Sequence, residues 1–190
     1  MTIASFTIRC KLVVKDNPIE QVMQFRYMGI DISSTHDPVK DLRSHINKAS
    51  ALSGCLRDIV WSKDSKIRIY KTCIRPIMTY GTEVREDTNK TKQMLRVAEM
   101  KTLRTIVGKT SRDRVRNTDV KKQCGIQDIV RWGRQRKKQW YNHVRRMDEN
   151  RKIVLENNPP GSRPPGRPPR RWKDSWQSTS HEKIQRQLQN

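Results

Sequence analysis

A proline-rich and arginine-rich run near the end of the chain sets the strongest limit on its fold. Residues 159–173 read PPGSRPPGRPPRRWK and contain no acidic residue. Proline fixes φ, removes an amide donor and pushes the preceding residue out of the helical region, so this run is expected to be extended and hydrated. A compact domain must therefore lie before it, and we expect residues 157–190 to form a disordered tail rich in Pro and Arg.

The chain is strongly basic, and most of the excess lies in its second half. Its 190 residues include 41 Lys and Arg against 19 Asp and Glu, which gives a formal net charge of +22. Residues 1–100 carry 17 basic and 11 acidic side chains, whereas residues 101–190 carry 24 and 8. Arginine binds phosphate through two parallel hydrogen bonds, and a basic field attracts polyanions. Nucleic acid is therefore the favoured partner, although an anionic membrane surface would attract the same charge.

Other classes of function fit the composition less well. Hydrophobic residues make up 33% of the chain, and no stretch approaches the roughly 18 apolar residues that cross a bilayer. The first residues lack the basic lead of a signal peptide, so we expect a soluble, intracellular protein. Cys10, Cys55, Cys73 and Cys124 lack metal-ligand spacing, which predicts no metal and buried, reduced thiols.

The first 34 residues have the alternating pattern of short strands. Residues 6–14 and 19–25 alternate apolar with polar side chains for most of their length, and residues 15–18 supply turn chemistry between them. Residues 27–32 predict a third strand, with Gly29 at a bulge or a close approach of another group. The expected structure over residues 1–34 is thus a small β-hairpin or three-stranded region.

The pattern then becomes helical, which makes the predicted fold mainly α. Apolar side chains recur at three- and four-residue steps in three segments, and these are expected to form a bundle within residues 35–110. Asp37 is suited to begin the first helix, Pro76 to kink or end the second and Gly108 to end the third. The three segments are residues 37–59, 64–77 and 88–107.

A basic segment, residues 111–156, is predicted to hold a short helix over residues 112–124 and a longer one over residues 127–147. No acidic residue interrupts residues 131–147, whereas soluble helices normally mix charges of both signs. We interpret the longer helix as a nucleic-acid face; a plain solvated basic face is the alternative. The cations expected to lie off its apolar stripe and to contact nucleic acid are Arg131, Arg134, Lys137, Lys138 and Arg145.

The apolar stripe of the same helix is predicted to contain Trp132, Trp140 and His143. Tryptophans that alternate with cations let bases stack while the backbone charge is neutralised. Burial in a core is the alternative for both tryptophans. His143 is interpreted as a hydrogen-bonded core side chain.

Four segments together resemble the reverse transcriptases of non-LTR, LINE-like retrotransposons. Residues 25–29 (FRYMG) are similar to the motif that follows the catalytic palm, residues 70–81 (YKTCIRPIMTYG) to the signature of the thumb, and residues 131–147 to the segment after it. Residues 166–172 (GRPPRRW) resemble the end of the same proteins. The resemblance covers residues 8–178 and depends on the order and spacing of the four segments.

The resemblance implies an RNA-directed DNA polymerase, usually fused to an endonuclease. Such a polymerase holds two metal ions with an Asp on one palm strand and a Tyr-x-Asp-Asp turn, and this sequence contains no such turn. We therefore expect no catalytic residue, metal, cofactor or small-molecule substrate, and interpret the chain as a non-catalytic remnant from a truncated or decayed element or a partial gene model. The acidic pairs at residues 86–87 and 148–149 are interpreted as solvated helix ends.

In this family the retained parts bind nucleic acid. The helices of residues 35–110 correspond to a thumb, which packs along the template-primer duplex by shape and phosphate contacts. Phe25, Tyr27, Met28 and Gly29 correspond to the hairpin that supports the primer end; the core of a small sheet is the alternative for them. We expect sequence-nonspecific binding to RNA or DNA, in the nucleus or in a cytoplasmic ribonucleoprotein.

The tail is expected to add phosphate contacts and one stacking side chain. These residues are Arg163, Arg167, Arg170, Arg171 and Trp172. Two other interpretations of the tail stay open. Residues 165–168 (PGRP) resemble the core of an AT-hook that binds the minor groove, and the prolines suit a polyproline ligand for an aromatic-lined protein groove.

Overall fold

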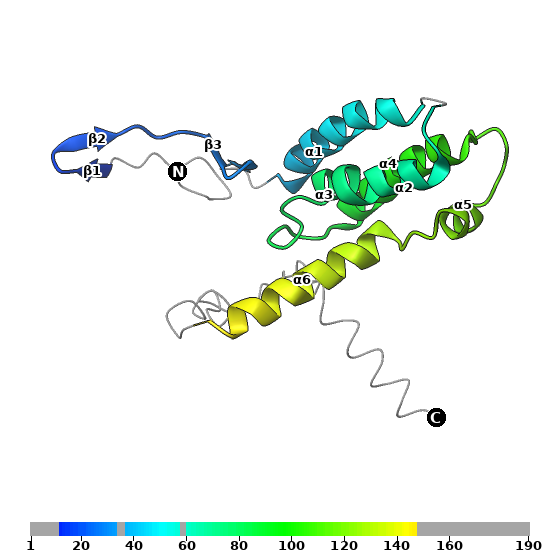
Figure 1. The fold of residues 1–190 in the computed structure, drawn as a ribbon. Helices are drawn as coiled ribbons and strands as arrows, with labels where there is room; N and C mark the ends of the chain where they lie inside the picture. Colours follow the sequence, from blue (N-terminus) through cyan, green and yellow to red (C-terminus); the bar gives the residue numbers. More distant parts are fainter. Residues whose placement is uncertain (1–11, 34–36, 58–59, 148–190) are drawn as a thin grey trace, which may run out of the picture. The chain divides into compact units, whose positions relative to one another are not determined.

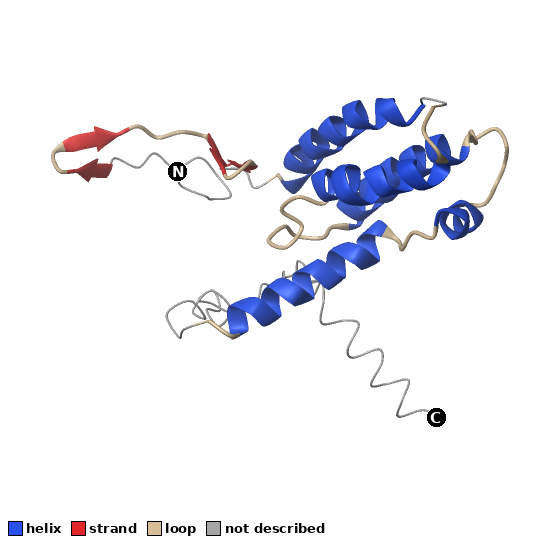
Figure 2. Cartoon of the chain, viewed as in Figure 1, coloured by secondary structure: helices blue, strands red, loops and turns tan. Residues whose placement is uncertain are grey.

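The computed structural model describes residues 12–33, 37–57 and 60–147. Short antiparallel strands come first and helices follow (Figures 1 and 2), so the predicted mainly α fold with a small N-terminal β region is confirmed. The tail predicted over residues 157–190 lies outside the described residues. The four-part division of the chain stays a prediction.

The described chain divides into two compact units, and the division falls inside helix α1 (Pro38–Ser53). The N-terminal unit is residues 1–44, and the C-terminal unit is residues 45–190. Within the described ranges, no helix is long and apolar enough to cross a membrane.

The strands form two separate hairpins rather than one three-stranded region. β1 (Leu12–Val14) pairs antiparallel with β2 (Asn17–Ile19), and β3 (Gln24–Tyr27) pairs antiparallel with β4 (Ile30–Ser33). Pro18, predicted in the first turn, instead lies in β2 opposite Val13. The turn has two residues, Lys15 and Asp16, instead of the predicted four. Their φ values of 50° and 61° are positive, as in a two-residue hairpin loop.

The turn between β3 and β4 also differs from the prediction. Met28 and Gly29 have φ values of 46° and 80° and connect the strands directly. A two-residue loop with two positive φ values matches the twist of a hairpin, so Gly29 lies in a tight turn and the predicted bulge is wrong. The hairpin joins α1 through Asp41, whose Oδ1 accepts a hydrogen bond from the amide of Asp31 at 3.2 Å.

Helix α1 begins as predicted and ends earlier. Asp37 Oδ1 accepts the amide of Val39 at 2.9 Å, and Pro38 is the first helical residue, where no amide donor is needed. The predicted helix reached residue 59, but α1 ends at Ser53 and a tighter 3-10 turn, η1 (Gly54–Arg57), buries Leu56.

The segment around Pro76 accommodates the proline through a wide helical turn. Helix α2 (Lys63–Ile69) passes into a π-helix, η2 (Tyr70–Ile74), and then into α3 (Arg75–Met78). The amide of Arg75 donates to the carbonyl of Tyr70, five residues back. The helical run thus continues to Met78 and ends two residues after Pro76.

Helix α4 (Asn89–Val107) is the centre of the C-terminal unit. Thr88 Oγ1 accepts the amide of Thr91 at 3.1 Å, and Gly108 ends the helix at φ 68°, both as predicted. In the C-terminal unit α4 contacts η1, α2, α5 (Asn117–Cys124) and α6 (Ile129–Arg145). The core therefore lies around α4, where Leu103 is fully buried.

Helix α5 starts at Asn117, five residues after the predicted start. The guanidinium of Arg104 donates to the carbonyls of Thr110 and Val115 at 2.9 and 2.8 Å, and Asp113 accepts the amide of Thr110 at 2.6 Å. These bonds hold residues 110–116 as a loop, a tertiary effect that helical periodicity does not contain.

Candidate nucleic-acid interface

One face of α6 packs against the rest of the C-terminal unit. Val130, Gly133, Lys137 and Val144 are buried along it. A Cβ atom on Gly133 would lie 3.0 Å from Cγ2 of Thr82, so this glycine permits the close approach of the loop before α4. The helix is therefore turned about its axis relative to the prediction.

This rotation corrects the predicted apolar stripe. His143, expected in the core, is exposed, and Trp132 and Trp140 are only partly buried. The hydrophobic pattern gave the wrong face because a glycine and a lysine occupy two of the central buried positions, and neither counts as apolar in such a pattern.

Four of the five predicted α6 cations share one side of the helix. Arg131, Arg134, Lys138 and Arg145 follow at steps of three, four and seven residues, which keeps them on one helical face. Arg131, Lys138 and Arg145 are exposed and Arg134 is half-buried. We call these four residues the α6 basic stripe; from first to last they span about 21 Å at a rise of ~1.5 Å per residue.

Within the described residues, neighbouring acids do not cancel the charge of the α6 basic stripe. Among the residues that the structure describes, no carboxylate pairs with Arg131, Lys138 or Arg145. Long, exposed cations on one side of a rigid helix can each reach a phosphate while the buried side holds the helix in place.

The fifth predicted cation, Lys137, does not face solvent. Its side chain is 0% exposed, and Nζ lies 3.1 Å from Oδ2 of Asp87 and donates to the carbonyl of Arg85 at 2.5 Å. Lys137 is therefore unavailable to phosphate, which corrects its assignment. The interpretation of Asp87 as part of a solvated helix end is also wrong. Its side chain is only 13% exposed and pairs with the buried ammonium group of Lys137.

Lys137 should make stability depend on pH. Burial lowers the pKa of its ammonium group below the ordinary value of 10.5, with Asp87 opposing that shift. At a pH between the lowered pKa and 10.5 the unfolded chain binds more protons than the folded chain, so stability should rise as the pH rises toward 10.5. In urea titrations at about pH 8 and pH 10, Lys137→Met should lose that rise. An equal rise in both proteins would contradict the prediction.

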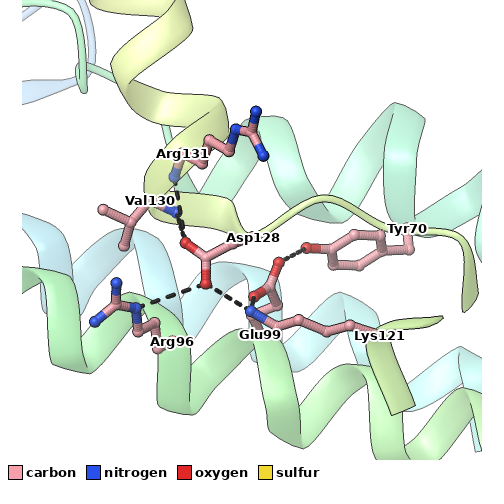
Figure 3. A network of polar contacts seen from close by, with 7 residues as sticks. All are labelled: Tyr70, Arg96, Glu99, Lys121, Asp128, Val130 and Arg131. Atoms are coloured by element: carbon pink, nitrogen blue, oxygen red, sulfur yellow. Dashed lines mark hydrogen bonds and ion pairs between the residues drawn. The ribbon is translucent and has the colours of Figure 1, made fainter. Parts of the chain in front are cut away.

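A partly buried network of charges holds the start of α6 against α4 and α5 (Figure 3). Nζ of Lys121, on α5, lies 2.8 Å from Oε2 of Glu99 and 2.6 Å from Oδ2 of Asp128. Glu99, on α4, is 0% exposed and its Oε1 accepts the hydroxyl of Tyr70 at 3.2 Å. One ammonium group therefore joins two carboxylates from two elements.

The groups of this network shift one another's proton affinity. Burial raises the pKa of Glu99, opposed by its bonds with Lys121 and the backbone of Ile129. Burial also raises the pKa of the Tyr70 hydroxyl, as does the nearby charge of Glu99. For Lys121, burial acts to lower the pKa but the hydrogen bonds to Asp128 and Glu99 outweigh it, so its pKa is raised.

Asp128 connects this network to the backbone of α6. Its Oδ1 accepts the amides of Val130 and Arg131 at 3.0 and 3.2 Å, which caps the helix, while Oδ2 pairs with Lys121 and lies 3.6 Å from Nε of Arg96. Burial acts to raise its pKa, but the hydrogen bond and the charge of Lys121 lead the effects that lower it overall. The α6 basic stripe thus begins on a fixed support.

A second cationic group surrounds Trp132. The guanidinium carbon of Arg75 lies 4.7 Å from the centre of the Trp132 ring, and that of Arg136 lies 5.5 Å from it. Both distances suit cation–π attraction. The sequence did not single out either arginine for this position, because nothing local to residue 75 indicates contact with residue 132.

The hairpin predicted to resemble a primer grip belongs to the N-terminal unit. Phe25 and Tyr27 alternate along β3 and are 51% and 54% exposed, and Met28 in the turn is 73% exposed. Arg26, between the two aromatic residues, pairs with Asp31 at 2.8 Å. The alternative that these residues form the core of a small sheet is therefore wrong, while their role at a primer end stays a prediction.

The remaining predicted residues are the cysteines and the contact residues of the tail. Cys124 is buried as expected, but Cys55 and Cys73 are exposed, so burial was wrongly predicted for these two. In the part of the chain that the structure describes, no group of three His, Cys, Asp or Glu residues could hold a metal ion. The predicted contacts of the tail lie outside the described residues: Arg163, Arg167, Arg170, Arg171 and Trp172.

Fold and site together define a mainly helical protein with a cationic face on its last described helix. The chain is similar to a transposon-derived protein of Caenorhabditis elegans, with 24% identity over 167 residues. The match covers 83% of this chain and 60% of that protein, so the chain spans less than two thirds of its relative. No family model matches the chain, and no solved structure does. The similarity supports a transposon-related origin.

Proposed function

We propose that this chain is the non-catalytic thumb and tail part of a LINE-like retrotransposon reverse transcriptase and that it binds RNA or DNA without sequence preference. The α6 basic stripe carries the proposal, because its cations lie on one side of an anchored helix. The similarity to a transposon-derived protein agrees with the proposed origin. Its working location would be the nucleus or a cytoplasmic ribonucleoprotein.

The chemistry of the stripe favours contacts to the nucleic-acid backbone. Three arginines and one lysine over about 21 Å would face roughly six base-pair steps of a duplex at ~3.4 Å per step. Contacts of this kind fix the position of a duplex but carry no sequence information. Binding should therefore depend on charge and duplex shape, with little preference for particular bases.

The salt dependence of binding tests this function. The affinity of the full chain for a short RNA–DNA heteroduplex, measured by fluorescence anisotropy from about 50 to 200 mM salt, should fall with a log–log slope of about −3 to −4 or steeper. Matched A·T-rich and G·C-rich DNA duplexes should bind within about threefold of each other. A flat salt dependence would rule the function out, and a strong A·T preference would favour the AT-hook hypothesis.

The non-catalytic part of the proposal has its own test. Primer extension on an RNA template, with magnesium or manganese and all four deoxynucleotides, should give no product above the level without protein. Any template-dependent incorporation by this chain would overturn the assignment, because such synthesis requires carboxylates that position two metal ions.

A further inference from the structure

The group around Trp132 has a feature that packing alone does not require. Arg75 comes from α3, whereas Arg136 lies one turn after Trp132 on α6, yet both guanidinium groups lie over the same indole ring. Stacking on an aromatic face leaves the N–H groups at the edge of a guanidinium free to bind in its own plane.

The two arginines differ in how their charge is balanced. Nε of Arg136 lies 3.2 Å from Oε1 of Glu83. Arg75 is half-buried, but in the described residues no carboxylate pairs with it, and its buried Nε has no hydrogen-bond acceptor there. The buried Lys137, by contrast, has a carboxylate within 3.1 Å. Arg75 is therefore a half-buried cation without a counter-charge in the described structure.

The π-helix places Arg75 in this position. Its wide turn over residues 70–74 ends with the amide of Arg75 bonded to the carbonyl of Tyr70. One extra residue in a helical turn rotates the following side chains by about 100° relative to a regular helix. Such π-turns are frequent at functional sites. The local backbone thus orients Arg75 toward α6.

We propose that Arg75, with Arg136 beside it, binds a phosphodiester group of the nucleic-acid backbone. The site deepens the nucleic-acid binding proposed above and rests on it. A stacked guanidinium offers two parallel N–H donors in a fixed plane, the geometry that matches two phosphate oxygens. Glu83 holds Arg136 in the free protein, and an incoming phosphate would compete with that carboxylate.

Replacement of arginine by lysine isolates this geometry, because net charge is unchanged. At about 100 mM salt, Arg75→Lys should weaken binding of the RNA–DNA heteroduplex about tenfold, since lysine loses both the stack and the paired donors. Arg136→Lys should weaken it by about threefold. The matched control is Arg68→Lys, an exposed residue on α2 that should change affinity by less than about twofold.

A second pair of variants tests whether the affinity for the heteroduplex increases when Arg136 loses its carboxylate partner. Glu83→Gln releases Arg136 and should tighten binding about fivefold, whereas Glu86→Gln in the same loop removes the same charge and should tighten it about twofold. The Arg75 site is overturned if Arg75→Lys changes the affinity no more than Arg68→Lys does, and Glu83→Gln no more than Glu86→Gln does. If the unmodified chain still binds the heteroduplex with the expected salt slope, the proposed function stands in that case. If the heteroduplex does not bind at any salt concentration, the proposed function fails, and this site fails with it.

Discussion

Lys121→Met should lower the free energy of unfolding by about 3–5 kcal/mol, because it leaves the fully buried carboxylate of Glu99 without its cation. That cost is a large share of the roughly 5–15 kcal/mol that stabilises a typical domain. Urea denaturation of the full chain, followed by circular dichroism, measures the change. The side chain of Lys121 also holds Asp128, so the start of α6 should loosen first.

The neighbouring lysine supplies a matched control. Lys122 is exposed on the same helix, and Lys122→Met should change the free energy of unfolding by less than about 0.5 kcal/mol. The double variant Lys121→Met with Glu99→Leu removes the buried carboxylate together with its cation and should recover most of the loss. If Lys121→Met unfolds at the same urea concentration as Lys122→Met, the network does not support the fold.

Reversing the α6 basic stripe should nearly abolish nucleic-acid binding. The triple variant Arg131→Glu, Lys138→Glu and Arg145→Glu removes three phosphate contacts and adds three repulsions. Affinity for the heteroduplex at about 100 mM salt should fall on the order of a thousandfold, and the salt slope should shrink by about three. Fluorescence anisotropy across the salt series measures both quantities.

A second triple variant separates the position of the charges from their number. Lys48, Arg68 and Lys122 belong to the C-terminal unit and are exposed on α1, α2 and α5, and their reversal to Glu gives the same net charge. This variant should lose only about tenfold in affinity through weaker general attraction. Equal losses in the two variants would mean that α6 has no special role. Circular dichroism checks that both remain folded.

The parts of the fold that follow from local chemistry were predictable from the sequence. Asp37 with Pro38 begins α1, and Thr88 and Gly108 bound α4, because caps and left-handed glycines act on their own neighbours. The start of α5 was missed because side-chain bonds from Arg104, on the preceding helix α4, hold the loop before it.

The candidate site was predictable only in part, for a similar reason. The sequence indicated a basic helix and four cations that do share one side of it, yet it could not set the rotation of that helix. Gly133 against Thr82 and the pairing of Lys137 with Asp87 fix the rotation, and both depend on a loop about fifty residues earlier. The contact of Arg75 with Trp132 depends on the π-helix that precedes Arg75. In the sequence, only Pro76 indicated an irregular helix at this point.

Two different faces of α6 pack against the protein and face solvent. Gly133, Lys137 and Val144 hold the helix in place, while Arg131, Lys138 and Arg145 take no part in that packing. Substitutions on the solvent-facing side can therefore change the affinity for a polyanion in small steps without disturbing the fold. An engineer could use this independence to build a graded set of binders on one unchanged scaffold.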